Sequence, residues 1–194
     1  MKSFSLNGSV RTETGKKATK AIRANGNIPC ILYGCGKVIS TFVVTNNDVR
    51  KLIYTPEIFV VELNIDGKAY KAIMQEVQFH PVNDKVLHID FLEVSENKPV
   101  VMKVPVVSVG HAEGVKAGGK LIQNVRRLKV KAVYTDIPET LEINVESLGL
   151  NKSIQVKDLS FDKLELLDNP QNVVITVKPT RAAAAAMAAA KNAK

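Results

Sequence analysis

The sequence lacks most of what a disulfide-stapled, membrane-spanning or zinc-binding protein needs. It contains only two cysteines, Cys30 and Cys35. Two cysteines are too few for a disulfide framework, and without nearby histidines they are also too few for a zinc site. No apolar run approaches the ~20 residues of a membrane helix, and the N-terminus lacks the apolar region of a signal peptide. We therefore expect two ordinary thiols, no membrane partner and a reduced, cytoplasmic protein.

Motifs of the common enzyme classes are also missing. No Gly-x-Ser-x-Gly string of a hydrolase nucleophile occurs. The segment 114–120 fits the Gly-x4-Gly-Lys pattern of a phosphate-binding loop, but Leu121 stands where Ser or Thr would hold magnesium, and the residues after it predict no helix. We interpret these glycines as turns between strands. We expect no catalytic residue, no cofactor and no metal.

Acidic residues are scarce at the N-terminus, where basic residues gather. The whole chain has 27 Lys and Arg against 19 Asp and Glu, a formal charge of +8. The first 37 residues carry seven basic residues and only one acidic residue, Glu13, and so account for +6 of that charge. This distribution favours an anionic partner that binds near the N-terminus.

The hydrophobic pattern predicts a mainly β protein. Hydrophobic residues make up 45% of the chain, enough to bury cores, and Asp66-Gly67 is a strong hairpin signal. Apolar alternation predicts strands over 3–10, 30–33, 41–45, 58–65, 68–79 and 85–94, and then over 100–109, 121–134, 141–145, 153–156 and 173–177.

Two helices interrupt the predicted strands of the first half. One covers 16–25 and is stopped by Asn25-Gly26, and a short one covers 47–52, opened by an Asn or Asp cap. The polar residues before Pro99 mark a domain boundary. We expect a small antiparallel β-barrel with a few helices over 1–94, a second all-β domain over 95–180, and an Ala-rich basic tail over 181–194.

The predicted first helix carries its cations on one face. At 100° per residue, Lys16, Lys20 and Arg23 share a narrow arc, and Ala18, Ala21 and Ile22 lie opposite. Such a face can reach several phosphates of a nucleic acid, or it can be a solvated surface. Arg11 just upstream and the local charge favour phosphate binding.

A second polar group lies on the predicted strands. His88 and Asp90 are two residues apart and share one strand face, where the carboxylate can fix the imidazole tautomer. Tyr33 ends a strand and can stack on a base or ribose. The His–Asp pair fits a general base, a metal ligand, hydrogen bonding to RNA, or a purely structural bond. Only His80 is nearby as a further ligand, which disfavours a metal.

Taken together, these strings resemble a known family, the bacterial large-subunit ribosomal protein twenty-five, or CTC (general stress protein), family in its two-domain form. The resemblance covers about residues 1–179. It is carried by Gly15-Lys16-x3-Lys20-x2-Arg23-x2-Gly26-x-Ile28-Pro29-x3-Tyr33-Gly34, by Gln75-x-Val77-Gln78-x-His80-Pro81, by His88-Ile89-Asp90-Phe91, and in the second half by Val104-Pro105-Val106, Gly110-x3-Gly114-Val115-x2-Gly118-Gly119-x-Leu121, Asp136-Ile137-Pro138-Glu139 and Val156-x-Asp158-Leu159.

The resemblance implies a structural, non-enzymatic ribosomal protein that binds 5S rRNA. It also implies a barrel similar to the anticodon-binding region of glutaminyl-tRNA synthetase, followed by a second β-domain. The family often has arginines where this chain has Lys20 and Ala21, and a lysine keeps the charge but loses the bidentate fork. The RNA-binding residues implied are Arg11, Arg23, Tyr33, His88 and Asp90, with Lys16, Lys20 and Gln75 as weaker correspondences.

Two other functions remain open at the level of sequence. One is a tRNA-binding accessory module, because the related barrel reads anticodons. The other is a hydrolase that uses His88 and Asp90. The expected partners are 5S rRNA and the large ribosomal subunit, with other ribosomal RNA or ribosomal proteins as candidates for the second domain.

Overall fold

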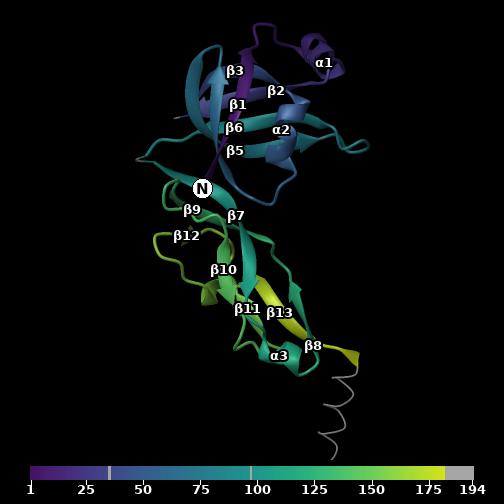
Figure 1. The fold of residues 1–194 in the computed structure, drawn as a ribbon, viewed down its shortest axis with the longest axis vertical. Helices are drawn as coiled ribbons and strands as arrows, with labels where there is room; N and C mark the ends of the chain where they lie inside the picture. Colours follow the sequence, from purple (N-terminus) through teal and green to yellow (C-terminus); the bar gives the residue numbers. More distant parts are fainter. Residues whose placement is uncertain (35, 97, 182–194) are drawn as a thin grey trace, which may run out of the picture. The chain divides into compact units, whose positions relative to one another are not determined.

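The computed structural model describes residues 1–34, 36–96 and 98–181 of the chain (Figure 1). Two compact units are present. The first comprises Met1–Val100 with Val133–Thr135, and the second comprises Val101–Ala132 and the chain from Asp136 onward. Both are built mainly from β-strands, which confirms the predicted fold class. Cys35 and nearly all of the predicted Ala-rich tail lie outside the described residues.

Six strands of the first unit form a closed barrel. Their order is β1-β3-β2-β6-β5-β4. Four neighbouring pairs are antiparallel, whereas β1 runs parallel to β4 and β2 runs parallel to β6. The predicted small barrel is therefore present, with two parallel pairings in place of a wholly antiparallel sheet. The strands are β1 (Lys2–Val10), β2 (Asn27–Gly34), β3 (Lys37–Thr45), β4 (Phe59–Ile65), β5 (Lys68–Phe79) and β6 (Val86–Glu93).

Strand alternation fills the barrel interior. Along β4, Val61, Leu63 and Ile65 are buried, while Glu62 and Asn64 between them are exposed. Each such aliphatic side chain contributes about 1.5–3 kcal/mol on full burial. The Asp66-Gly67 turn that joins β4 to β5 has positive φ at both residues, 46° and 84°, as the two-residue hairpin predicted from sequence requires.

Two helices accompany the barrel. The α1 helix (Lys16–Ala24) contacts β2 and ends before Asn25, close to its predicted boundary. No residue of α1 is fully buried. Ala18 and Ile22 are half-buried, and Ala21 is exposed. The α2 helix (Asn46–Ile53) follows Thr45, whose side chain makes no capping hydrogen bond. The prediction of an Asn or Asp cap is therefore wrong.

The second unit contains two sheets. One has the order β10-β7-β9-β12 and the other β11-β13-β8. The predicted single strand over 121–134 is wrong, because the chain leaves β8 at Asn124 and re-enters a different sheet at Arg127. The elements are β7 (Pro99–Val109), α3 (Glu113–Lys116), β8 (Gly119–Gln123), β9 (Arg127–Val133), β10 (Leu141–Asn144), β11 (Ser153–Gln155), η1 (Val156–Asp158), β12 (Glu165–Leu166) and β13 (Val173–Pro179).

Of the three glycines interpreted from sequence as turns, only Gly118 lies in a turn, whereas Gly114 lies in α3 and Gly119 begins β8. The α3 helix is four residues long and precedes Lys120, whereas a phosphate-binding loop needs a helix after that lysine. Gly118 has a φ of +88° and leads directly into β8. This backbone conformation is open to glycine and costly for residues with a Cβ.

Cys30 lies in the barrel core. Its thiol is buried and contacts the Ile28 carbonyl oxygen at 3.6 Å. Burial raises the pKa of the Cys30 thiol, and the charge of Asp90 raises it further, so the reactive thiolate is suppressed. In the described part of the chain, no three His, Cys, Asp or Glu side chains gather as metal ligands. The helices described there are all too short or too polar to cross a membrane.

Candidate RNA-binding surface

Three neighbouring strands, β2, β6 and β5, present a row of polar side chains on the outside of the barrel. Asp90 of β6 is the register partner of Ile31 on β2 and of Glu76 on β5. His88, two residues earlier, is the partner of Gln78. Because side chains alternate across a strand while Ile89 and Phe91 fill the core, His88 and Asp90 face outward.

The centre of this row is a hydrogen-bonded His–Asp pair. His88 Nδ1 lies 2.7 Å from Asp90 Oδ1, and the two side chains are 26% and 27% exposed. The bond uses the Nδ1 proton and leaves Nε2 outside this bond. The pair can therefore present one defined acceptor, together with the second carboxylate oxygen.

Tyr33 belongs to the same outer face on β2. Its register partner on β6 is Leu92, two residues beyond Asp90. Partial burial raises the pKa of the Tyr33 hydroxyl, and the negative charges of Asp90 and Glu76 raise it further. The hydroxyl therefore keeps its proton at neutral pH and can donate a hydrogen bond to a phosphate or ribose oxygen.

Arg23 connects the basic helix to this row. Its Nε donates a hydrogen bond of 3.0 Å to the carbonyl oxygen of Leu87. Leu87 is the extra residue of a β-bulge, since Gln78 pairs with His88 and Phe79 pairs with Val86. The bulge frees a carbonyl that the strand ladder would otherwise use. The two terminal nitrogens of Arg23 remain for a ligand, and Leu87, which holds Arg23, directly precedes His88 in the sequence.

Arg11 has a structural role in the described chain. Its Nε donates to the Glu13 carbonyl oxygen at 2.6 Å, and one terminal nitrogen donates to Thr19 Oγ1 at 2.7 Å. Thr19 in turn donates to the carbonyl oxygen of Gly15. Arg11 thus ties the loop before α1 to the helix, and its remaining donors are the part available to RNA.

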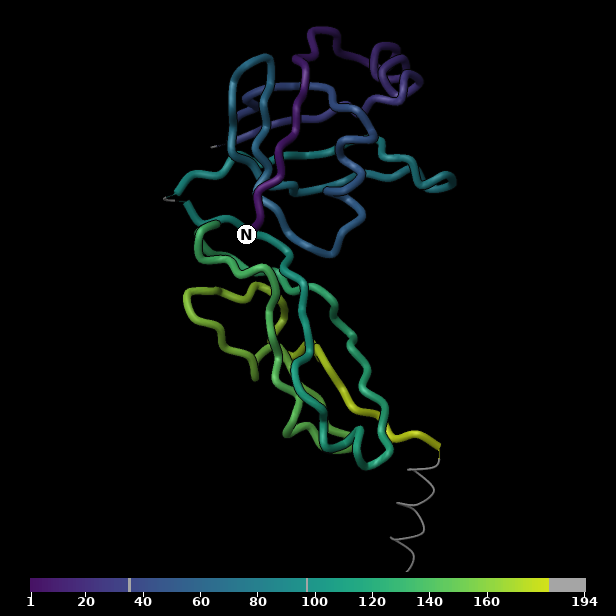
Figure 2. Tube along the Cα trace, viewed as in Figure 1, coloured from purple at the N-terminus to yellow at the C-terminus, as the bar shows by residue number. Residues whose placement is uncertain are grey.

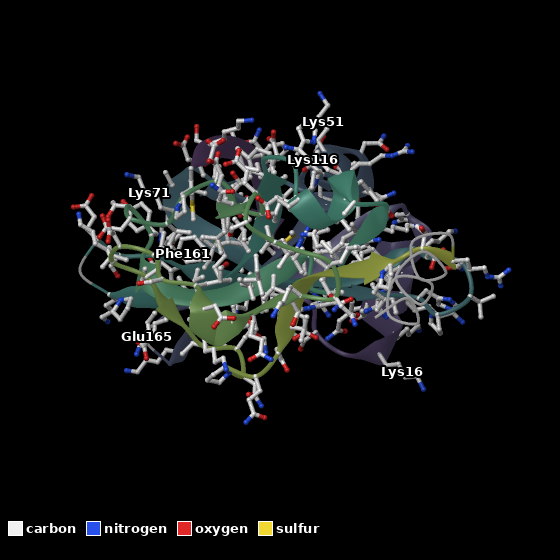
Figure 3. The ribbon with its side chains drawn as sticks, turned by 90° about the horizontal axis from the view of Figure 1, so that it is seen from below. Lys16, Lys51, Lys71, Lys116, Phe161 and Glu165 are labelled. Carbon is white, nitrogen blue, oxygen red and sulfur yellow. The ribbon has the colours of Figure 1, made fainter. Side chains whose placement is uncertain are left out.

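The lysines of α1 face solvent. Lys16, Lys17 and Lys20 are exposed, and Lys16 extends away from the ribbon (Figure 3). None of the three forms an ion pair with a described residue. The α1 helix and the β5–β6 hairpin project from the same side of the barrel (Figure 2), and the Arg23–Leu87 bond joins them. Cations and the polar row therefore lie next to each other.

Gln75 differs from the other predicted residues. It is the extra residue of a second bulge, because Met74 pairs with Phe91 and Glu76 pairs with Asp90. It therefore has no register partner on β6. Gln78, opposite His88, and Glu76, opposite Asp90, were not predicted to belong to the surface. Counting back in steps of two from His80 along the predicted strand would have placed both on one face.

Comparison with known proteins covers both units. The model of the Ribosomal L25p family matches residues 6–91, and that of the ribosomal protein TL5 C-terminal domain matches residues 99–181. A Porphyromonas gingivalis protein named large ribosomal subunit protein bL25 is 56% identical over 184 residues, 94% of this chain and 96% of its own. A protein of the same name from Bacteroides thetaiotaomicron is 52% identical over 195 residues, 98% of this chain and 99% of its own.

Proposed function

Because the chain belongs to the ribosomal L25p family, and is therefore a structural protein of the large ribosomal subunit rather than an enzyme, we propose that its first unit binds 5S rRNA. The protein would act in the bacterial cytoplasm, where large subunits assemble and work. The main support for the proposal is the His88–Asp90 pair on the outer face of the barrel. This pair lies next to Leu87 of β6, whose carbonyl oxygen accepts a hydrogen bond from Arg23.

The chemistry of the surface suits the minor groove of an RNA helix. That groove is wide and shallow and exposes 2′-hydroxyls and base edges. A barrel face can lie in it, with His88 Nε2 accepting from a 2′-hydroxyl and the free Asp90 oxygen accepting from a hydroxyl or a guanine amino group. Tyr33 supplies a donor on the adjacent strand. The cations of α1 then hold the phosphate backbone beside the groove.

The direct test is competition between RNAs for the full-length chain. We expect 5S rRNA to bind at least about tenfold more tightly than bulk tRNA, a difference of ~1.4 kcal/mol. Fluorescence anisotropy with labelled 5S rRNA and unlabelled tRNA as competitor measures this preference. Equal or stronger competition by tRNA would identify the chain as a tRNA-binding module instead.

Binding should weaken steeply with salt if the α1 cations contact phosphates. With about four contacts from the α1 region, the slope of log K against log salt should be roughly −3 to −4. Lys20→Ala should flatten that slope by about one unit, since an exposed lysine holds a phosphate without reading sequence. Tyr33→Ala should lower affinity with little change in slope, because its contact is uncharged.

The matched control for Lys20→Ala is Lys51→Ala. Lys51 is an exposed lysine on α2, outside the proposed surface, so its removal changes net charge equally. The slope should stay at the wild-type value in this variant. A wild-type slope near zero, or equal flattening in both lysine variants, would contradict the proposed phosphate contacts of α1.

A further inference from the structure

Two lysines face each other directly in the smaller sheet of the second unit. Lys120 of β8 and Lys178 of β13 are register partners in an antiparallel pair, and both are exposed. Like charges directly opposite each other on neighbouring strands destabilise a sheet. Neither lysine forms an ion pair with any described residue. The sheet therefore carries an unfavourable charge pair that nothing in the described chain neutralises.

The rest of this sheet face adds hydroxyls and no carboxylates. The strands β8, β11 and β13 contain no acidic residue at all. Two residues along from the lysines, Thr176 is the partner of both Ile122 and Ser153, so two hydroxyl side chains continue the same face. Thr176 donates its hydroxyl to the Lys152 carbonyl oxygen, and Ser153 is exposed.

Further cations lie at the end of the sheet. The hydroxyl of Thr180 donates to the Gly118 carbonyl oxygen at 2.7 Å, which ties the end of β13 to the start of β8. Arg181 follows Thr180 directly, and Lys116 ends α3 two residues before Gly118. Both side chains are exposed. We call Lys120, Lys178 and Ser153 together the lysine face, and Lys116 and Arg181 are the cations nearest to its end along the chain.

We propose that the lysine face is a second RNA-binding surface, which holds the phosphate backbone of ribosomal RNA independently of the first unit. A phosphate oxygen between two ammonium groups removes the repulsion between them and accepts hydrogen bonds from both. Serine hydroxyls are common partners of phosphate oxygens in the same contacts. Lysines are flexible point charges, so this surface positions the domain on RNA and reads no sequence.

The proposal is tested in the full-length chain with the four α1 cations removed by Lys16→Ala, Lys17→Ala, Lys20→Ala and Arg23→Ala. The probe is a labelled 20-base-pair RNA duplex of arbitrary sequence, and its Kd is measured over a range of salt concentrations. Lys178→Glu should weaken duplex binding about five- to tenfold and flatten the salt slope by about two units, because the substitution removes one cation and its new carboxylate neutralises Lys120. Lys120→Glu should behave the same way.

Thermal unfolding separates binding from stability. Each single reversal turns the like-charge pair into an opposite-charge pair, so it should raise the Tm while it weakens binding. The double variant Lys120→Glu/Lys178→Glu restores a like-charge pair, so its Tm should return to that of the parent while its binding is weakest. A fold defect cannot give this pattern, because it would lower Tm and binding together.

The matched control is Lys103→Glu, the same charge change at an exposed lysine on β7 of the other sheet. It should leave duplex binding within about twofold of the parent. Equal loss in this control, absence of duplex binding by the parent, or unchanged binding in Lys178→Glu would each overturn the proposal. If Lys178→Glu binds the duplex as the parent does but is retained less in purified large subunits, the lysine face binds a protein instead of RNA. Binding of 5S rRNA by the chain with an intact α1 tests the first proposal separately.

Discussion

The Arg23→Ala variant should bind 5S rRNA roughly 1–3 kcal/mol more weakly than the wild-type chain, the scale of a good charged or bidentate contact. The Arg23 Nε is held at 3.0 Å from the Leu87 carbonyl oxygen, so the guanidinium is positioned before RNA arrives. Preorganisation of this kind reduces the entropy lost on binding. The substitution removes the terminal donors, their charge and the bond between α1 and β6 at once.

Two further variants make this prediction specific. Arg23→Lys should recover only part of the loss, because one ammonium group cannot reach the Leu87 carbonyl and also present a planar fork to RNA. Arg50→Ala, at an exposed arginine of α2, should bind as wild type does. Titration calorimetry measures the affinities, and far-UV circular dichroism checks the fold. Full recovery in Arg23→Lys would show that Arg23 acts only through its charge.

The His88→Ala variant should also lose roughly 1–3 kcal/mol of 5S rRNA binding. The ring sits at the centre of the polar row, and its Nδ1 is already engaged by Asp90 at 2.7 Å. In the proposed interface, its Nε2 is therefore a fixed group that would meet the RNA without a choice of tautomer. His111→Ala, at an exposed histidine of the second unit, is the matched control and should leave binding unchanged.

A double-mutant cycle between His88 and Asp90 tests how the pair works. If Asp90 braces the imidazole in addition to its own contact, Asp90→Ala should cost less once His88 is already alanine than it does in the wild-type chain, and the coupling should be about 0.5–3 kcal/mol. Strictly additive losses would contradict the bracing role and leave Asp90 with its own contact alone. Wild-type affinity in His88→Ala would remove the polar row from the proposed interface.

The candidate site shows which of its features a local sequence pattern can predict and which it cannot. His88 and Asp90, two residues apart, share a strand face and lie within hydrogen-bond distance, because alternation depends only on the backbone of that strand. The bulges at Gln75 and Leu87 were not predictable in the same way. A bulge depends on how two distant strands pair and pack, and it decided that Gln78 faces His88 and that Leu87 can accept a bond from Arg23.

The sequence by itself determined the local elements and the charge distribution, which favours an anionic partner. The α1 helix, the Asp66-Gly67 hairpin and most strands follow from residue periodicity and turn chemistry, and the basic N-terminus follows from composition. Only the tertiary structure decided the parallel closure of β1 on β4, the division of 121–134 between two sheets, and the opposition of Lys120 and Lys178. These features depend on pairing between segments far apart in the chain. A short window of sequence does not show which of the competing strand pairings has the lowest free energy.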